Sequence, residues 1–159
     1  MIKRLVFSFV VLSVVLSTAT AQSTIFIVRH AEKADATKDP DLSEAGRVRA
    51  EALAKMLQDA NITAIYATEF KRTQQTAAPL AKALGITVTT LPAENSAALI
   101  AKLRSSNGNA LVVGHGNTIA DLIKALGISE PINIAENDYD NLFGVVLVEK
   151  PQLIRLHYR

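Results

Sequence analysis

The sequence predicts an α/β fold in which helices cover both faces of a largely parallel sheet. Short apolar runs typical of buried strands alternate with amphipathic stretches typical of helices along the 159 residues. This alternation implies parallel strands that are connected by helices packed on the sheet. In addition, residues able to carry chemistry follow directly after the apolar runs, at the edge of the sheet where ligands bind in open α/β folds.

The first 21 residues have the pattern of a signal peptide. A Lys-Arg pair is followed by the apolar residues 5–16 and then by Ala19-Thr20-Ala21, which matches the A-x-A cleavage pattern. We therefore expect residues 1–21 to be removed near Ala21 and the mature domain to span residues 22–159. An uncleaved membrane anchor is the alternative, but a bilayer span needs about 20 apolar residues. The expected location is periplasmic or extracellular.

Composition excludes several classes of function. Removing the two basic residues of the leader from the 17 Lys and Arg leaves as many basic as the 15 acidic residues, so the domain is formally neutral. Aromatic residues make up 5% of the chain and no Lys/Arg-rich block is present, so we expect no nucleic-acid partner. The absence of cysteine rules out disulfides, lipid attachment at cysteine, thiolate metal sites and a cysteine nucleophile.

The first half of the domain contains three predicted strands and two helices. The apolar run that begins at Thr24 stops abruptly at Arg29-His30, where the first strand ends. Ser43 is a suitable N-cap for a helix over 44–60. The inward face of this helix is expected to carry Val48, Ala52, Leu53, Met56 and Leu57. The following elements are a strand over 63–67, a helix over 72–84 that Gly85 ends, and a strand over 86–90.

The second half contains two predicted helices and three strands. Residues 96–103 form a short helix, and the continuous apolar run 110–113 is typical of a buried strand. A helix over 118–126 is closed by Gly127. Its inward face is expected to carry Ile119, Leu122, Ile123 and Leu126. Two final strands over 143–148 and 153–156, joined through Lys150-Pro151, are expected to add an antiparallel edge.

Four residues that could bind phosphate follow the predicted strands. Arg29 and His30 follow the first strand, Arg72 lies just beyond the second, and His115 follows the fourth. Guanidinium groups match phosphate oxygens bidentately, and a neutral imidazole nitrogen can attack phosphorus. Backbone N–H groups around Asn117 and Thr118, at a helix start, would add weak attraction for an anion. We therefore predict one phosphoryl-binding crevice.

Each of these residues has a structural interpretation when it is taken alone. A single histidine after a strand is more often a hydrogen-bonded structural residue than a catalyst, and Arg72 beside Lys71 could be a solvated helix residue. It is the joint pattern that favours catalysis. His157 lies in a polar-alternating strand without such neighbours, and we interpret it as structural or exposed.

Four sequence blocks resemble motifs of the histidine phosphatase superfamily, branch 1, the phosphoglycerate mutase-like proteins. Arg29-His30-Ala31 resembles the opening Arg-His-Gly, with alanine in place of glycine. Leu42-Ser43-Glu44-Ala45-Gly46 resembles Leu-Thr/Ser-x-x-Gly, and residues 68–77 resemble Ser-x-x-x-Arg-x-x-Gln-Thr-Ala. Gly114-His115-Gly116 resembles the block with the second histidine. Because the blocks keep their order across nearly all of the mature chain, it is identified as a small exported member.

The resemblance implies a three-layer α/β/α sandwich and a reaction without metal or cofactor. It implies that His30 is the nucleophile that becomes phosphohistidine, and that Arg29, Arg72 and His115 hold the phosphoryl oxygens. Water then attacks the phosphoenzyme. Glu94 is the candidate general acid.

Glu32 is a weaker candidate for the acid, because it lies only two residues beyond the nucleophile. In the other branch of the superfamily an aspartate follows the second histidine, but Gly116-Asn117 stands there in this chain. The family's asparagine shortly after Arg-His-Gly is also missing, since Lys33, Ala34, Asp35 and Ala36 occupy that region, and residues 38–41 could shape the mouth of the site differently.

The leading hypothesis is an exported, metal-independent phosphatase acting on phosphomonoesters or phosphoramidates. Its expected partner is a small phosphorylated substrate, a phosphorylated envelope component or a phosphoprotein, with no membrane partner after cleavage. A non-catalytic phosphate-binding domain of the same fold is one alternative. A phosphoglycerate mutase-type phosphotransferase is another, but the chain has no room for the large inserts that form a lid in mutases.

Overall fold

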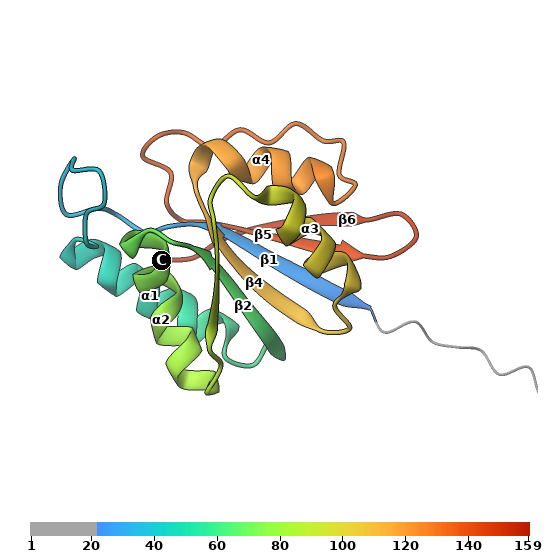
Figure 1. Cartoon of the computed structure of the whole chain (residues 1–159), viewed down its shortest axis with the longest axis horizontal. Coiled ribbons are helices and arrows are strands. Elements are labelled where there is room, and N and C mark those ends of the chain that lie inside the picture. Colours follow the sequence, from blue (N-terminus) through green and yellow to red (C-terminus); the bar gives the residue numbers. More distant parts are fainter. Residues whose placement is uncertain (1–21) are drawn as a thin grey trace, which may run out of the picture.

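A computed structural model describes residues 22–159 (Figure 1), so the predicted signal peptide lies outside the described residues. The centre of the domain is a six-stranded sheet with the strand order β3-β2-β4-β1-β5-β6. The strands are β1 (Ser23–Arg29), β2 (Ile62–Thr68), β3 (Val88–Leu91), β4 (Asn109–Gly114), β5 (Asn141–Leu147) and β6 (Gln152–His157). Strands β1 to β4 are mutually parallel, whereas β5 pairs antiparallel with both β1 and β6. The mostly parallel sheet and its antiparallel edge are therefore confirmed.

Two pairs of helices cover the two faces of the sheet. The helices are α1 (Glu44–Leu57), α2 (Lys71–Leu84), α3 (Ser96–Ser105) and α4 (Gly116–Ala125). One apolar core joins α1 and α2 to the sheet, and a second core joins α3 and α4 to its other face. Figure 1 shows the two pairs on opposite sides of the strands. The fold is therefore the three-layer α/β/α sandwich.

Strand β1 shows why its sequence forms a buried strand. Ile25 and Ile27 are fully buried in the α3/α4 core, and Val28 is fully buried in the α1/α2 core. A strand that contacts helices on both faces needs apolar residues at successive positions. The pairing with β4 extends one residue past the strand, because the backbone N–H of His30 donates to the carbonyl oxygen of Gly114 at 2.9 Å. This pairing brings the residues that follow β1 beside those that follow β4.

The buried face of α1 differs from the prediction. Ser43 caps the helix as expected, since its hydroxyl oxygen accepts from the backbone N–H of Gly46 at 3.0 Å. However, Val48 is 61% exposed and Met56 is 44% exposed. The buried residues are Gly46, Ala50, Leu53, Ala54 and Leu57. The helix approaches the chain after β1 so closely that a Cβ atom on Gly46 would lie 2.3 Å from the carbonyl oxygen of Glu32, so only glycine fits at that position.

The remaining helices and strands agree with the prediction apart from their ends. Gly85 ends α2 with φ 66°, and Gly127 follows α4 with φ 104°, left-handed conformations that glycine adopts readily. Helix α4 begins at Gly116, two residues before the predicted start, and α1 ends at Leu57 rather than at residue 60. Within residues 22–159, no helix combines the length and the apolar character needed to cross a membrane.

Candidate active site

The four predicted phosphate-binding residues meet in one cleft. Arg29, His30, Arg72 and His115 all line an open cleft of about 460 Å³ at the carboxyl ends of β1, β2 and β4. The imidazole rings of His30 and His115 lie edge to face, with their centroids 5.5 Å apart. The parallel topology thus unites residues that are up to 86 positions apart in the sequence.

His30 is held in one tautomer by the backbone. The residue is only 4% exposed, and its Nδ1 lies 2.8 Å from the carbonyl oxygen of Ala31. Because a carbonyl oxygen can only accept, the proton of the neutral ring is on Nδ1 and the lone pair is on Nε2. The backbone N–H of Ala31 donates to Oγ1 of Thr76 at 2.9 Å, which fixes this part of the chain to α2.

Both active-site histidines are neutral at physiological pH. Burial lowers the pKa of His30 to about 4, and the positive charges of Arg29 and Arg72 act in the same direction, although the bond to Ala31 opposes them. Burial also lowers the pKa of His115 to about 4, again with Arg72 and Arg29, whereas the carboxylate of Glu69 raises it. A neutral imidazole is the form that can act as a nucleophile.

A chain of hydroxyl groups sets the tautomer of His115. Its Nε2 lies 3.0 Å from Oγ1 of Thr68, which lies 2.9 Å from Oγ1 of Thr73. The hydroxyl of Thr73 can donate to the carbonyl oxygen of Phe70 at 2.8 Å or to that of Thr68 at 3.0 Å. Since Thr73 donates to a carbonyl, it accepts from Thr68, and Thr68 in turn accepts from Nε2–H of His115.

Arg29 is fixed by the segment between α4 and β5. Its Nη1 donates to the carbonyl oxygens of Ala135 at 3.2 Å and of Glu136 at 2.5 Å. Its guanidinium lies 4.3 Å from the ring centroid of Tyr139, a cation–π contact. The sequence contains no motif that marks this segment, because two of its three contacts with Arg29 are made by backbone carbonyl oxygens.

Arg72 is fixed from the loop after β1. Its Nη1 donates to the carbonyl oxygen of Lys38 at 3.2 Å and lies 3.9 Å from the Asp39 carboxylate. The ring centroid of Phe70 is 4.3 Å from the guanidinium.

Both active-site arginines retain an unused buried donor. The Nε atoms of Arg29 and Arg72 are buried and have no hydrogen-bond partner within residues 22–159. Buried donors without a partner carry a free-energy cost of about 1–3 kcal/mol each. Both arginines also line the cleft, so their guanidinium groups are available to an oxyanion bound there.

Backbone groups complete the cleft. Gly116 and Asn117, at the start of α4, line it, and their position agrees with the predicted anion attraction of a helix N-terminus. A Cβ atom on Gly116 would lie 3.4 Å from Nε of Arg29, so a side chain at this position would crowd that guanidinium. The amide of Thr118 is already used, because it donates to the carbonyl oxygen of His115 at 3.0 Å.

The candidate acids lie in three different environments. Glu94 is exposed on the loop between β3 and α3 and is not among the residues that line the cleft. Glu32 is paired with Arg49 at 2.6 Å. Partial burial favours its neutral form, but the hydrogen bonds from Arg49, a backbone hydrogen bond and the positive charge of Arg49 together outweigh this and lower its pKa, so Glu32 is held ionised. Glu136, which the sequence did not indicate, is the one acidic residue among the described residues that line the cleft.

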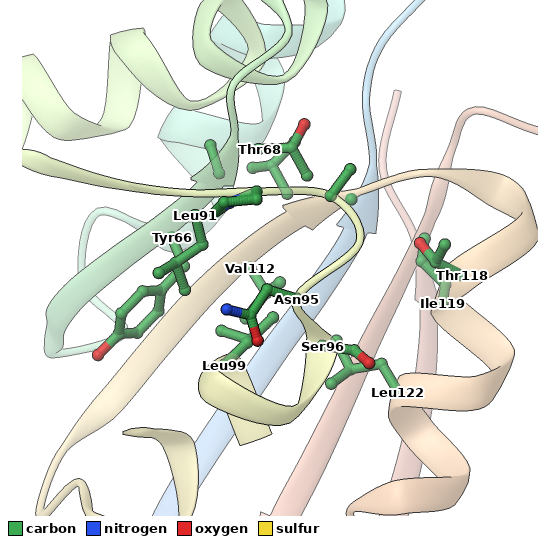
Figure 2. Close-up of a pocket in the computed structure, with 15 residues that line it drawn as sticks. Tyr66, Thr68, Leu91, Asn95, Ser96, Leu99, Val112, Thr118, Ile119 and Leu122 are labelled. Atoms are coloured by element: carbon green, nitrogen blue, oxygen red, sulfur yellow. The ribbon is translucent and has the colours of Figure 1, made fainter. Parts of the chain in front are cut away.

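A second, largely apolar pocket lies between the sheet and the helices α3 and α4. Its wall includes Leu91, Leu99, Val112 and Leu122, and it shares no lining residue with the cleft (Figure 2). The loop that carries Glu94 borders this pocket through its neighbouring residues, and the carboxylate of Glu69 accepts from the backbone N–H of Ala93 at 2.9 Å. With no charged side chain in its wall, the pocket offers no site for phosphate.

His157 lies outside the site, as predicted. It is in the edge strand β6, and its Nδ1 is 2.9 Å from the carboxylate of Asp140. These contacts agree with the interpretation of His157 as a structural or exposed residue.

Residues 25–95 match the model of the histidine phosphatase superfamily (branch 1). This range includes Arg29, His30, Arg72 and Glu94, whereas His115 lies beyond it. None of the curated proteins is significantly similar in sequence to this chain.

Solved structures with the same fold include several phosphatases. The protein histidine phosphatase SixA complexed with tungstate is 22% identical, with a TM-score of 0.70 and coverage of 84% of this chain and 96% of that chain. A mycobacterial glucosyl-3-phosphoglycerate phosphatase complexed with VO3 is 17% identical, with a TM-score of 0.68 and coverage of 86% of this chain and 99% of that chain. The structure named mycobacterial hydrolase 2 is 17% identical, with a TM-score of 0.68 and coverage of 83% and 89%.

Proposed function

We propose that this chain, which matches branch 1 of the histidine phosphatase superfamily in sequence and its phosphatases in fold, is an exported, metal-independent phosphatase. It hydrolyses phosphomonoesters or phosphoramidates through a phosphohistidine at His30. The observation that carries this proposal is the meeting of a neutral, tautomer-fixed imidazole and two arginines in one cleft. That arrangement suits a nucleophile attacking a bound oxyanion.

The first step transfers the phosphoryl group to the enzyme. The Nε2 lone pair of His30 forms a bond to phosphorus while the bond from phosphorus to the leaving oxygen or nitrogen breaks. Arg29 and Arg72 bind the equatorial oxygens, where negative charge is spread in the transition state. In the second step water attacks the phosphohistidine, the P–N bond to His30 breaks, and inorganic phosphate is released.

His115 supports the charge of the bound phosphate. Its Nε2–H donates to Thr68, so Nδ1 of the neutral ring has no proton to donate. A phosphate dianion beside the ring raises the pKa of His115, because an opposite charge favours the imidazolium. Once protonated, His115 donates to the phosphate from Nδ1 and keeps its bond to Thr68.

The leaving group determines whether the protein must supply a general acid. An alkoxide needs a proton as the bond to phosphorus breaks, whereas a phosphoramidate protonated on its leaving group departs as a neutral amine or imidazole. Glu94 is the acid that the sequence resemblance implies, and Glu136 is the carboxylate that lines the cleft. Glu94→Gln and Glu136→Gln, assayed on an alkyl phosphate and on p-nitrophenyl phosphate, distinguish them. The acid's variant loses activity mainly on the alkyl phosphate.

The substrate belongs to the phosphorylated small molecules, envelope components or phosphoproteins. The solved structures with this fold include a protein histidine phosphatase and a glucosyl-3-phosphoglycerate phosphatase, which supports either kind of substrate. Export and cleavage near Ala21 remain part of the proposal and rest on the sequence pattern of residues 1–21. Mass spectrometry of the protein recovered from periplasm and medium tests this, since the expected first residue is Gln22.

Turnover of a chromogenic phosphomonoester by purified mature protein tests the activity. We expect phosphate release that His30→Ala abolishes while the thermal unfolding midpoint is retained, together with an acid-labile phosphoenzyme in the wild type. Phosphate binding without turnover in the wild type would favour the non-catalytic domain. Transfer of phosphate between positions of phosphoglycerate, without phosphate release, would favour the mutase.

A further inference from the structure

The mouth of the cleft has more positive charge than one phosphate requires. Besides Arg29 and Arg72, the lining includes Lys33 and Lys38, whereas Glu136 is the one acidic residue among the lining residues within the described chain. The two arginines can balance a phosphate dianion by themselves. Two exposed lysines that remain beside it indicate a second negative charge on the substrate.

The loop from Lys33 to Leu42 holds these lysines at the cleft. Its ends are joined by a bridge between Lys33 and Leu42 and by the N–H of Ala34, which donates to the carbonyl oxygen of Asp41 at 2.9 Å. The backbone of Lys38 is tied directly to the phosphate site, because its carbonyl oxygen accepts from Nη1 of Arg72. In Figure 1 the loop (blue) projects beyond the end of β1.

The acidic residues of this loop have other partners. Asp35 accepts from the backbone N–H of Thr37 at 2.8 Å. Asp39 accepts from the backbone N–H of Lys71 at 2.9 Å and lies near Arg72. Asp41 accepts from the side chain of Gln75 at 2.7 Å.

Within residues 22–159, Lys33 and Lys38 form no ion pair with a carboxylate, in contrast to Lys71, whose Nζ lies 4.0 Å from Asp41. Hydrogen bonds within the loop lower the pKa of the Asp35 carboxyl group, and the charge of Lys33, which acts on Asp35 only at longer range, is a minor cause. No ion pair in the described part of the chain therefore holds either ammonium group away from a ligand in the cleft.

We propose that Lys33 and Lys38 form a second anion subsite, so that the preferred substrate carries a phosphate or carboxylate in addition to the phosphate that is hydrolysed. This inference rests on the proposed phosphatase function and specifies its substrate class. Lys33 and Lys38 are specificity residues that contact the second anionic group. The chemistry takes place at His30, and a substrate with a single phosphate is turned over without their help.

Matched substrates test the subsite. Glycerol 3-phosphate and 3-phosphoglycerate differ by a carboxylate in place of a hydroxymethyl group, and fructose 6-phosphate and fructose 1,6-bisphosphate differ by a second phosphate. The variants are Lys33→Gln, Lys38→Gln and the double variant. Lys71→Gln and Lys55→Gln are controls that remove the same charge from lysines outside the cleft lining.

We expect kcat/KM for the doubly anionic substrates to fall about threefold in each single variant and about tenfold in the double variant, since exposed charge pairs contribute modestly. The change should come mainly from KM, shrink at high salt, and leave the singly anionic substrates and both controls unaffected. A loss confined to one substrate pair identifies the second group as carboxylate or phosphate. Equal losses on singly and doubly anionic substrates, or no loss in the double variant, would overturn the subsite.

A binding measurement separates failure of the subsite from failure of the proposed function. If the wild type hydrolyses no phosphate ester or phosphoramidate, the phosphatase proposal fails. Calorimetric titration of orthophosphate and of 2,3-bisphosphoglycerate then tests the subsite by itself. Tighter binding of the bisphosphate that the double variant loses supports the subsite, whereas equal affinities in the wild type overturn it.

Discussion

His30 owes its chemistry to two features of its immediate surroundings. The carbonyl oxygen of Ala31 accepts a hydrogen bond from Nδ1–H, and burial keeps the ring neutral. The tautomer is set by backbone geometry rather than by a carboxylate partner, so the ring gains orientation without a nearby negative charge that would repel phosphate. This is consistent with a nucleophile for an anionic substrate.

The low pKa of His30 gives a direct prediction. The ring protons of His30, assigned from the spectrum of His30→Ala, should titrate by NMR with a pKa of about 4 rather than the ordinary 6.5. The nucleophile should therefore stay available in moderately acidic solution. A midpoint at or above the ordinary value would show that the ring is hydrated or paired with an anion, contrary to the structure.

The same pKa shift makes stability depend on pH. Between about 4 and 6.5 the unfolded chain binds more protons at His30 and His115 than the folded chain does. The free energy of unfolding therefore rises with pH across this window and falls as the solution is acidified through it. Urea unfolding of the wild type and of His30→Ala should show a shallower pH dependence in the variant.

Arg72 should not tolerate lysine. Its guanidinium is oriented by Lys38 and Asp39, and the residue lines the cleft where the phosphate is proposed to bind. An ammonium is a point charge without the planar fork, so Arg72→Lys is expected to lower kcat/KM by about 100-fold even though the charge is retained. Wild-type kinetics in this variant, with the thermal midpoint unchanged, would mean that Arg72 does not bind the transferred phosphoryl group.

At the scale of elements, α2 connects the two sides of the site through its first two turns. Thr76 bonds both to the N–H of Ala31 and to the carbonyl oxygen of Arg72, at 2.9 and 2.7 Å. Gln75 bonds to the N–H of Leu42 at 2.8 Å and so fixes the end of the loop after β1. The Gln-Thr pair that the sequence singled out as a motif thus aligns the proposed nucleophile His30 with Arg72.

Thr76→Val tests this alignment. Valine has nearly the same shape, but it removes the acceptor for the N–H of Ala31 at a fully buried position. We expect kcat to fall about tenfold with KM nearly unchanged, because small misplacement of reacting groups is costly. Thr73→Val is a second variant with a distinct effect, since it interrupts the hydroxyl chain to His115 instead. If Thr76→Val lowered stability alone, with kcat intact in the folded fraction, its role would be packing.

The strands, the helices and the four residues that meet in the cleft could be predicted from the sequence because their signals are local. Apolar runs mark β1 and β4, Ser43 marks the start of α1, and the two arginines and two histidines follow strand ends. The inward face of α1 was predicted only in part, since Leu53 and Leu57 are buried as expected but Val48 and Met56 are not. Hydrophobic periodicity points to the largest apolar residues, here Val48 and Met56, whereas close packing of the helix selects small ones.

The segment between α4 and β5 could not be predicted either. It fixes Arg29 through the carbonyl oxygens of Ala135 and Glu136, which every residue possesses. Tyr139 and Glu136 also lie in a stretch without helical or strand periodicity. Whether this segment borders the cleft depends on the path of its backbone, and no residue type in the sequence indicates that path.

For the whole molecule, the topology determines the site. Parallel β1, β2 and β4 lie side by side in the centre of the sheet and end at the same edge. The residues that follow them are therefore gathered without a dedicated binding domain. The cleft remains open to solvent, which suits release of phosphate to water and admits substrates with a large second group.

This gathering of two arginines and two histidines predicts how the whole enzyme responds to a transition-state analogue. Vanadate forms a five-coordinate species that mimics the transition state of phosphoryl transfer, and such analogues bind at least about 100-fold more tightly than substrates. We expect inhibition of the mature protein by vanadate with an inhibition constant far below KM, and loss of vanadate binding in His30→Ala. EDTA should leave turnover unchanged, because the charge that binds the phosphoryl oxygens is supplied by Arg29 and Arg72. Activity that EDTA abolishes and a divalent metal restores would contradict this mechanism, even if the fold and the cleft are as described.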